Sequence, residues 1–213
     1  MCANACAGHD VATIFDELLQ AFRIYLMRAD APPVRDFLGG IDWEMPERKL
    51  HANGLDCLKH LRQAVELTAP GERELAMRLM QQANALRWGQ TYTAADFGHH
   101  FIDNYGWVEL FGTRGHFRNE RVAAGFLILG PGVVYPDHHH VAEEVYIPLT
   151  GTAEWRMGDG GFRRRRGGEV IHHASNVSHA MRTGGEPLLA LYLWRGGDLA
   201  QKSTIAAAGQ GAG

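Results

Sequence analysis

Residues 132–151 read Gly132-Val-Val-Tyr-Pro-Asp-His138-His139-His140-Val-Ala-Glu143-Glu144-Val-Tyr146-Ile-Pro-Leu-Thr-Gly151. Side chains alternate between the two faces of a strand, so an extended backbone places His138 and His140 on one side and turns His139 away. By the same rule Glu144 and Tyr146 share one face of the next extended run. The residues on its other face are apolar: Val145, Ile147 and Leu149. Two imidazoles and a carboxylate that converge from neighbouring strands suit a borderline divalent metal.

A third histidine follows in residues 168–179, which predict a strand, a tight turn and a second strand. Asn176 can adopt the left-handed backbone conformation that such a turn needs. His179 stands at the start of the second strand, where it can reach the histidine pair.

These two stretches resemble the cupin superfamily. Its first motif is Gly, five residues, His-x-His, three or four residues, Glu, six residues, Gly, and five positions here agree in spacing: Gly132, His138, His140, Glu144 and Gly151. The second motif keeps Gly168 and His179, but the positions of its Pro, Gly and Asn hold Ala174, Asn176 and Thr183. The resemblance implies a β-barrel of the jelly-roll type. It also implies one divalent metal ion bound by His138, His140, Glu144 and His179, with Zn, Fe, Mn, Ni and Co all open.

Four segments, the first of them inside residues 132–151, resemble the cupin-type dimethylsulfoniopropionate lyases of marine bacteria: Tyr135-Pro-x-His-x-His-x-Ala142-Glu-Glu144-x-Tyr146, Gln90-Thr-Tyr-Thr93, Asn104-Tyr-Gly-Trp107 and Leu189-Ala-Leu-Tyr192-Leu-Trp194-Arg-Gly. The likeness runs from about Trp88 to Ile205. It implies a carbon–sulfur lyase that cleaves a small-molecule substrate, dimethylsulfoniopropionate, into dimethyl sulfide and acrylate.

Tyrosines near the predicted metal are the candidates for the base that this reaction needs. Tyr146 shares a strand face with Glu144, and a nearby cation lowers the pKa of a phenol from its ordinary value of about 10. Tyr146 is therefore the first candidate base, and Tyr135, just before the histidine pair, is the second. The alternative role for Tyr146 is to line the barrel and hydrogen-bond a ligand.

Aromatic residues could bind the sulfonium end of the substrate, because aromatic faces attract cations by roughly 0.5–2 kcal/mol. Tyr192 and Trp194 alternate onto one face of the last predicted strand, and with Tyr135 they could line the pocket. Their alternative role is ordinary core packing.

Composition limits the other function classes. The chain has 213 residues, 46% of them hydrophobic, and a net charge of -3, which argues against nucleic acid as a partner. No apolar run reaches the roughly 18 residues that span a membrane. Cys2 and Cys6 stand in a terminus that lacks the basic start and long apolar stretch of a secretion signal, so we expect a reduced, cytoplasmic protein. A homodimer is left open.

The chain divides into three parts. Residues 1–87 contain three amphipathic patterns at helical spacing, the first after a plausible N-cap at Asp10, and predict a helical unit packed on the barrel. Pro32 and Pro33 end the first helix, and residues 31–49 predict an ordered connector. Residues 88–205 contain at least seven short strand-like runs, which is typical of an all-β barrel. Residues 206–213 are of low complexity and predict a disordered tail.

Three features receive only modest roles. Arg163–Arg166 lies between glycine pairs and predicts a solvated loop rather than a nucleic-acid site. One of His172 and His173 could point toward the metal site, although a partly buried structural histidine is the preferred interpretation. His99, His100 and His116 are assigned no role.

Two other functions remain as alternatives. A dioxygenase or isomerase can use the same three histidines and one glutamate, so the ligands alone do not decide the reaction. A ligand-sensing cupin is the non-enzyme alternative, but the helices before Trp88 lack a basic recognition helix.

Overall fold

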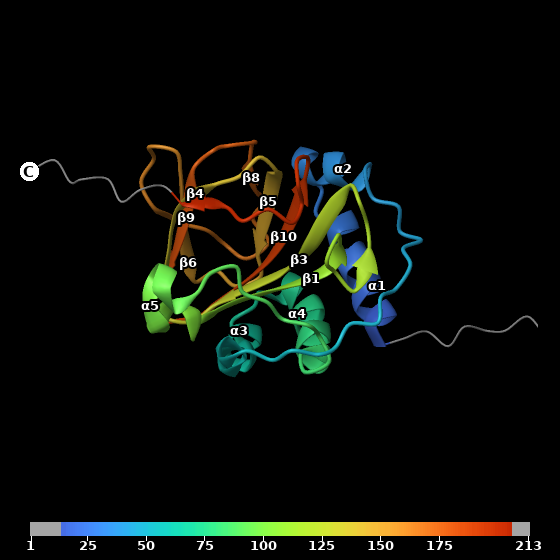
Figure 1. The fold of residues 1–213 in the computed structure, drawn as a ribbon, viewed down its shortest axis with the longest axis horizontal. Helices are drawn as coiled ribbons and strands as arrows, with labels where there is room; N and C mark the ends of the chain where they lie inside the picture. Colours follow the sequence, from blue (N-terminus) through green and yellow to red (C-terminus); the bar gives the residue numbers. More distant parts are fainter. Residues whose placement is uncertain (1–13, 206–213) are drawn as a thin grey trace, which may run out of the picture.

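A computed structural model of the chain describes residues 14–205, and its centre is a pair of facing β-sheets (Figure 1). Among these residues one sheet has the strand order β2-β1-β3-β10-β5-β8, and the other has β11-β4-β9-β6-β7. The predicted cupin-type β-barrel with an N-terminal helical extension is confirmed. The expected N-cap at Asp10, Cys2 and Cys6, and the tail from residue 206 lie outside the described residues.

The strands agree with the sequence pattern except at the shortest ones. The first sheet contains β1 Tyr105–Gly112, β2 Phe117–Arg118, β3 Val122–Leu129, β5 Glu143–Pro148, β8 Ile171–His173 and β10 Leu188–Arg195. The second contains β4 Val134–His139, β6 Ala153–Met157, β7 Arg163–Arg164, β9 His179–Thr183 and β11 Thr204–Ile205. In the expected loop at Arg163–Arg166, Arg165 is half-buried and the other three arginines are exposed, and the first two residues pair with β6 as an edge strand.

The helices are α1 Ile14–Arg28, α2 Pro32–Leu38, η1 Asp56–His60, α3 Leu61–Glu66, α4 Pro70–Gln82 and α5 Ala94–Ile102. Two of them were not predicted. Pro32 ends the first helix and also begins α2. Its missing N–H costs nothing there, because the first N–H groups of a helix have no partner within the helix. Helix α5 lies in the part expected to be all strand, and it begins at a capping box between Thr93 and Asp96.

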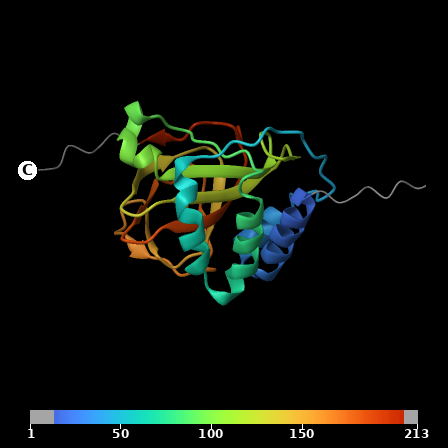
Figure 2. The same cartoon turned by 90° about the horizontal axis from the view of Figure 1, so that it is seen from below.

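Helices α1, α3 and α4 cover the outer face of the six-stranded sheet (Figure 2). Phe22 of α1 lies edge-on against Phe111 and Phe126, with ring centroids 5.7 and 5.4 Å apart. The expected apolar face of β5 belongs to this core, since Val145 and Ile147 are fully buried in it. Each such side chain contributes roughly 1.5–3 kcal/mol when buried. The helices and the sheet therefore share one core.

The inner face of this sheet forms the floor of the barrel. Glu109, Gly125, Tyr192 and Tyr146 stand in register across β1, β3, β10 and β5. A bulge in β1 follows Glu109, and the backbone approaches so closely here that a Cβ on Gly125 would lie 1.9 Å from the carbonyl oxygen of Val108. Glycine is therefore required at this position, and no side chain separates Glu109 from Tyr192.

The turn between β8 and β9 has the predicted conformation. Asn176 has a φ of 62°, and the amide of Val177 donates to the carbonyl of Ala174. The amide of Asn176 donates to the carbonyl of His140, at 2.9 Å, which ties this turn to the histidine pair. Among residues 14–205 no helix is long and apolar enough to cross a membrane.

Candidate metal centre

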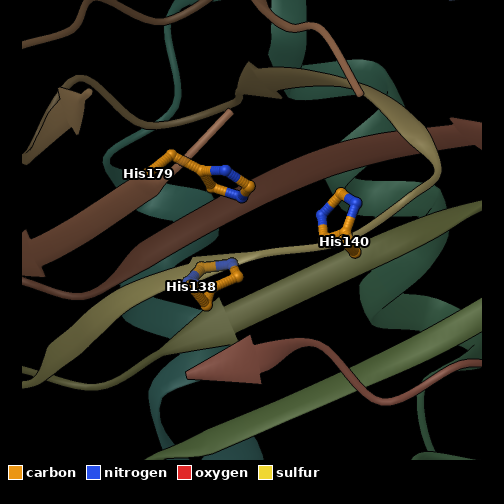
Figure 3. Close-up of side chains that lie close together, drawn as sticks. All are labelled: His138, His140 and His179. Carbon is orange, nitrogen blue, oxygen red and sulfur yellow. The ribbon is translucent and has the colours of Figure 1, made fainter. Parts of the chain in front are cut away.

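Three imidazoles converge inside the barrel (Figure 3). His138 is on β4, His140 follows that strand directly, and His179 begins β9 in register with His138. One ring nitrogen from each lies within 4.8 Å of the others, and all three side chains are buried. His139 is half-buried and lies outside this group, as the strand alternation predicts.

Backbone carbonyls orient the three rings. Nδ1 lies 2.8 Å from the carbonyl of Pro136 in His138, 2.7 Å from that of Ala142 in His140 and 2.9 Å from that of Val177 in His179. A carbonyl only accepts, so Nδ1 of each ring carries a hydrogen, which leaves Nε2 as the nitrogen that can bind a metal. This is how proteins orient histidines that bind a metal.

Glu144 completes the group. Its Oε2 lies 3.1 Å from Nε2 of His140 and 3.0 Å from Nε2 of His179, and Nε1 of Trp194 donates to its Oε1. Burial acts to raise the pKa of Glu144, but His140 and His179 outweigh it and hold the pKa well below its ordinary value. The carboxyl is therefore ionised. Burial also lowers the pKa of His138, with His179 adding to the effect, so that ring is neutral.

The donor set fits a divalent metal. Nε2 of His179 is buried and has no hydrogen-bond partner among the described residues, since its approach to Glu144 lacks hydrogen-bond geometry. A cation placed between these nitrogens and the ionised carboxylate would be attracted by all of them. Three nitrogens and one oxygen are a common ligand set for borderline metals and leave positions open for a ligand.

Aromatic residues enclose a pocket beside this centre. Its lining consists of Thr91, Tyr105, Trp107, Glu109, Arg114, Ala123, Leu127, Tyr135, Glu144, Tyr146, Tyr192, Trp194, Leu199, Gln201 and Ser203. The four aromatic residues predicted for the site are all among them: Tyr135, Tyr146, Tyr192 and Trp194. The structure therefore brings the predicted ligands and the predicted aromatic residues together in one place.

The two candidate bases differ in their contacts. Tyr135 stacks on His138, with ring centroids 4.2 Å apart, and its hydroxyl donates to that of Tyr92 at 3.2 Å. Tyr146 lies beside Glu144 on the floor of the pocket. Burial raises the pKa of both phenols well above its ordinary value, and the carboxylate of Glu144 adds to the rise at Tyr146. Without a cation, both phenols are therefore neutral.

The sequence profile of the dimethylsulfoniopropionate lyase family matches residues 39–190 of the chain. This chain belongs to that family. The dimethylsulfoniopropionate lyase DddQ of Ruegeria pomeroyi is 38% identical over 110 residues, and a putative lyase, DddL of Cereibacter sphaeroides, is 29% identical over 142 residues. These matches cover 52% and 65% of this chain and 55% and 59% of the relatives, so the chain matches little more than half the length of these curated proteins.

Solved structures of the same family share the whole fold. The crystal structure of DddQ from Ruegeria pomeroyi superposes with a TM-score of 0.81 at 28% identity and covers 90% of this chain and 95% of that one. A structure from work on the dimethylsulfoniopropionate lyases RdDddP and RnDddQII superposes with a TM-score of 0.83 at 28% identity, covering 91% and 98%. The architecture of this dimethylsulfoniopropionate lyase family member is therefore that of its relatives, helical part included.

Sequence reasoning missed an ion pair in the pocket of this family member. Glu109 is 3% exposed, and its Oε2 lies 3.2 Å from Nε of Arg114. Burial raises the pKa of Glu109, although Arg114 opposes the rise. The available signal was a lone acidic residue inside the apolar run of β1, where an inward-facing charge needs a partner.

His173 is more deeply buried and closer to the candidate metal ligands than the sequence indicates. It is fully buried and stacks on His179 with ring centroids 4.0 Å apart, whereas His172 pairs with Glu143 at 2.7 Å near the surface. Burial lowers the pKa of His173 to about 3, with His179 adding to the effect, so its ring is neutral. The inward-facing member of the pair is therefore His173, and it lies against a candidate metal ligand.

Proposed function

We propose that this chain is a metal-dependent lyase that cleaves dimethylsulfoniopropionate by β-elimination into dimethyl sulfide and acrylate. The observation that supports it best is the shared wall of the site: Glu144 contacts two of the converging histidines and also lines the aromatic pocket. A ligand in this pocket lies within reach of both the metal ligands and the tyrosines. Family membership supports the choice of substrate.

The proposed metal ligands are His138, His140, Glu144 and His179. When bound there, a divalent cation supplies positive charge to the substrate carboxylate and so acidifies the neighbouring α-carbon. Zn, Fe, Mn, Ni and Co all suit three nitrogens and one oxygen, so the donor set does not select among them.

Tyr146 is the proposed general base. Its phenolic oxygen takes the α-proton, the electron pair of the C–H bond becomes the new C=C bond, and the C–S bond breaks. The sulfur leaves with that bonding pair as neutral dimethyl sulfide, and the carboxylate stays on acrylate. Positive charge beside Glu144 offsets the negative charge that helps to raise the pKa of Tyr146, and so favours phenolate. Tyr135 is the second candidate.

The aromatic wall is proposed to hold the sulfonium group. Tyr192 is in register with Tyr146, and Trp194 is in register with Glu144, so both side chains stand on the same floor as the reacting groups. Together with Tyr135 they offer ring faces to a cation, each worth roughly 0.5–2 kcal/mol. Binding both ends of the substrate fixes the α-carbon near the base.

The test is a headspace measurement of dimethyl sulfide, run without oxygen on purified protein. We expect dimethyl sulfide and acrylate in equal amounts, loss of both after chelation, and recovery when a divalent metal is returned. β-Elimination needs no oxidant, so a reaction that requires oxygen would indicate a dioxygenase instead. If the metal-loaded protein releases no dimethyl sulfide, the lyase proposal is wrong.

A further inference from the structure

One wall of the pocket is a strap, defined here as residues 198–205, which crosses the barrel after β10. Gly196 and Gly197 have φ values of 78° and 66°, which allow the chain to reverse before it. The strap ends as β11, which pairs with β4 opposite His138 and His139. In Figure 1 it is the last coloured part of the ribbon, which ends beside β4. The strap therefore links β10 to the strand that carries the histidine pair.

Side chains of the strap alternate between pocket and solvent. Leu199, Gln201 and Ser203 line the pocket, whereas Ala200 and Lys202 are exposed. This period of two is that of an extended segment lying on a surface. A ligand in the pocket therefore has the sheet on one side and the strap on another.

Arg114 connects the floor of the barrel to the strap. Its backbone amide and its Nε approach the carboxylate of Glu109, at 2.6 and 3.2 Å, and its guanidinium lies 4.8 Å from the centre of the Trp107 ring. The other two nitrogens of the guanidinium donate to the carbonyls of Leu199 and Ala200, both at 3.4 Å. One side chain thus bridges a buried carboxylate and two successive strap carbonyls.

The two ends of this bridge differ in strength. Distances of 3.4 Å are longer than those of a usual N–H···O bond, roughly 2.7–3.2 Å, so the strap contacts are the weaker ones. The carboxylate of Glu109 is buried and its contacts with Arg114 are charged on both sides, which strengthens them. The two contacts with strap carbonyls can therefore be released while Arg114 stays on Glu109.

We propose that Arg114 is the positioning residue that holds the strap closed over the pocket, and that release of its two carbonyl contacts admits the substrate. The guanidinium suits this task because its planar fork reaches two acceptors while its Nε stays with a third. The structural part is independent of the reaction, and only the kinetic part rests on the proposed function.

The structural test uses trypsin, which cleaves after Lys202 in the strap. Arg114→Lys keeps a positive charge beside Glu109 but loses the forked guanidinium that reaches two carbonyls. Arg114→Gln loses both the charge and the guanidinium. We expect cleavage after Lys202 in the full-length, metal-loaded protein to be about tenfold faster in both variants, because cleavage follows the population of the open form. Arg118→Gln is the matched control, since Arg118 is an exposed arginine whose side chain, within residues 14–205, pairs with Glu120 away from the strap.

The melting temperature, measured alongside, separates the strap from global unfolding. We expect Arg114→Lys to melt like the wild type, because its charge still pairs with Glu109, so its faster cleavage reports the strap. If both Arg114 variants are cut at the wild-type rate, Arg114 does not hold the strap. If only Arg114→Gln is cut faster, charge rather than the fork holds the strap, and the proposed latch is wrong.

The kinetic test uses dimethylsulfoniopropionate as the substrate. We expect Arg114→Lys to raise KM about tenfold and to change kcat little, because the bound substrate loses a wall while the reacting groups keep their places. A fall in kcat at unchanged KM would place Arg114 in the chemical step and overturn the proposal. If the wild type also releases no dimethyl sulfide, the proposed function fails, and the trypsin result still decides the proposal about the strap.

Discussion

The two faces of the six-stranded sheet are built by the same strands with opposite chemistry. On β5, Glu144 and Tyr146 point into the barrel, while Val145 and Ile147 point outward into the core shared with the helices. The inner face therefore buries a carboxylate and phenols at a cost in free energy, and the outer face buries apolar side chains with a gain. The helical layer therefore stabilises a sheet whose other face carries the candidate metal centre and its pocket.

The largest effect is expected from a proposed metal ligand on the inner side. His140→Ala should lose the bound metal and reduce dimethyl sulfide release to background. Removing a group that only hydrogen-bonds a metal ligand already lowers metal affinity by roughly 10–100-fold, and removing the ligand itself should lower it further. Metal analysis of the purified variant is the measurement. His139→Ala is the matched control, because this adjacent ring lies outside the converging group. Wild-type metal content in His140→Ala would remove His140 from the ligand set.

The next largest effect is expected at Tyr146, and its neighbour Ile147 on β5 provides the comparison. Tyr146→Phe keeps the ring and removes only the oxygen, so kcat should fall by about 10²–10⁴ while KM and metal content stay the same. Ile147→Val, one residue along on the outer face, should leave kcat unchanged and lower stability by about 0.5–1.5 kcal/mol. Steady-state kinetics and urea unfolding measure the two. If Tyr146→Phe keeps most of its kcat, Tyr135→Phe becomes the decisive variant.

The inner and outer faces of β5, and the ligand spacing, were predictable because they depend on local alternation along the chain. The sequence pattern does not predict helices α2 and α5, because Pro32 and Pro33 end one helix and equally allow another to begin, and because the capping box at Thr93 is a short signal next to strand-like runs. The Glu109–Arg114 pair could not be placed from sequence: its orientation depends on a β-bulge, and the guanidinium contacts a carbonyl 85 residues away. The structure does not test the boundaries of the three predicted parts, which stay predictions.

A third variant removes packing between helix α1 and the outer face of the six-stranded sheet. Phe22→Ala removes a fully buried ring that lies edge-on against Phe111 and Phe126, and should cost about 3–5 kcal/mol of stability. The fraction that remains folded should keep its kcat, because the pocket lies on the other side of the sheet. Met27→Ala on the same helix is the control, since Met27 is 64% exposed. Equal losses of stability in the two variants would contradict a core shared by helix and sheet. In the same way, a stably folded fragment of residues 1–87 would contradict it.

The smallest effect concerns a buried histidine on the helical side. His116 is fully buried, its ring lies 4.4 Å from that of Phe15, and its Nε2 accepts from the amide of Arg87. Burial lowers its pKa from 6.5 to about 4, with Arg87 adding to the effect. Because the folded state binds a proton here more weakly than the unfolded state, this contribution to stability is complete above pH 6.5 and is lost as the pH falls toward 4.

His116→Phe should therefore flatten the fall in unfolding free energy between pH 6.5 and about 4, measured by urea unfolding at several values in that range. At neutral pH the variant is expected to be less stable, because the amide of Arg87 loses its acceptor. The two curves should consequently converge on the acid side. His99→Phe is the control, since His99 is exposed on α5 and should leave the slope as it is. Parallel curves for His116→Phe and the wild type would mean that acid destabilises this protein through groups other than the histidine beneath its helical layer.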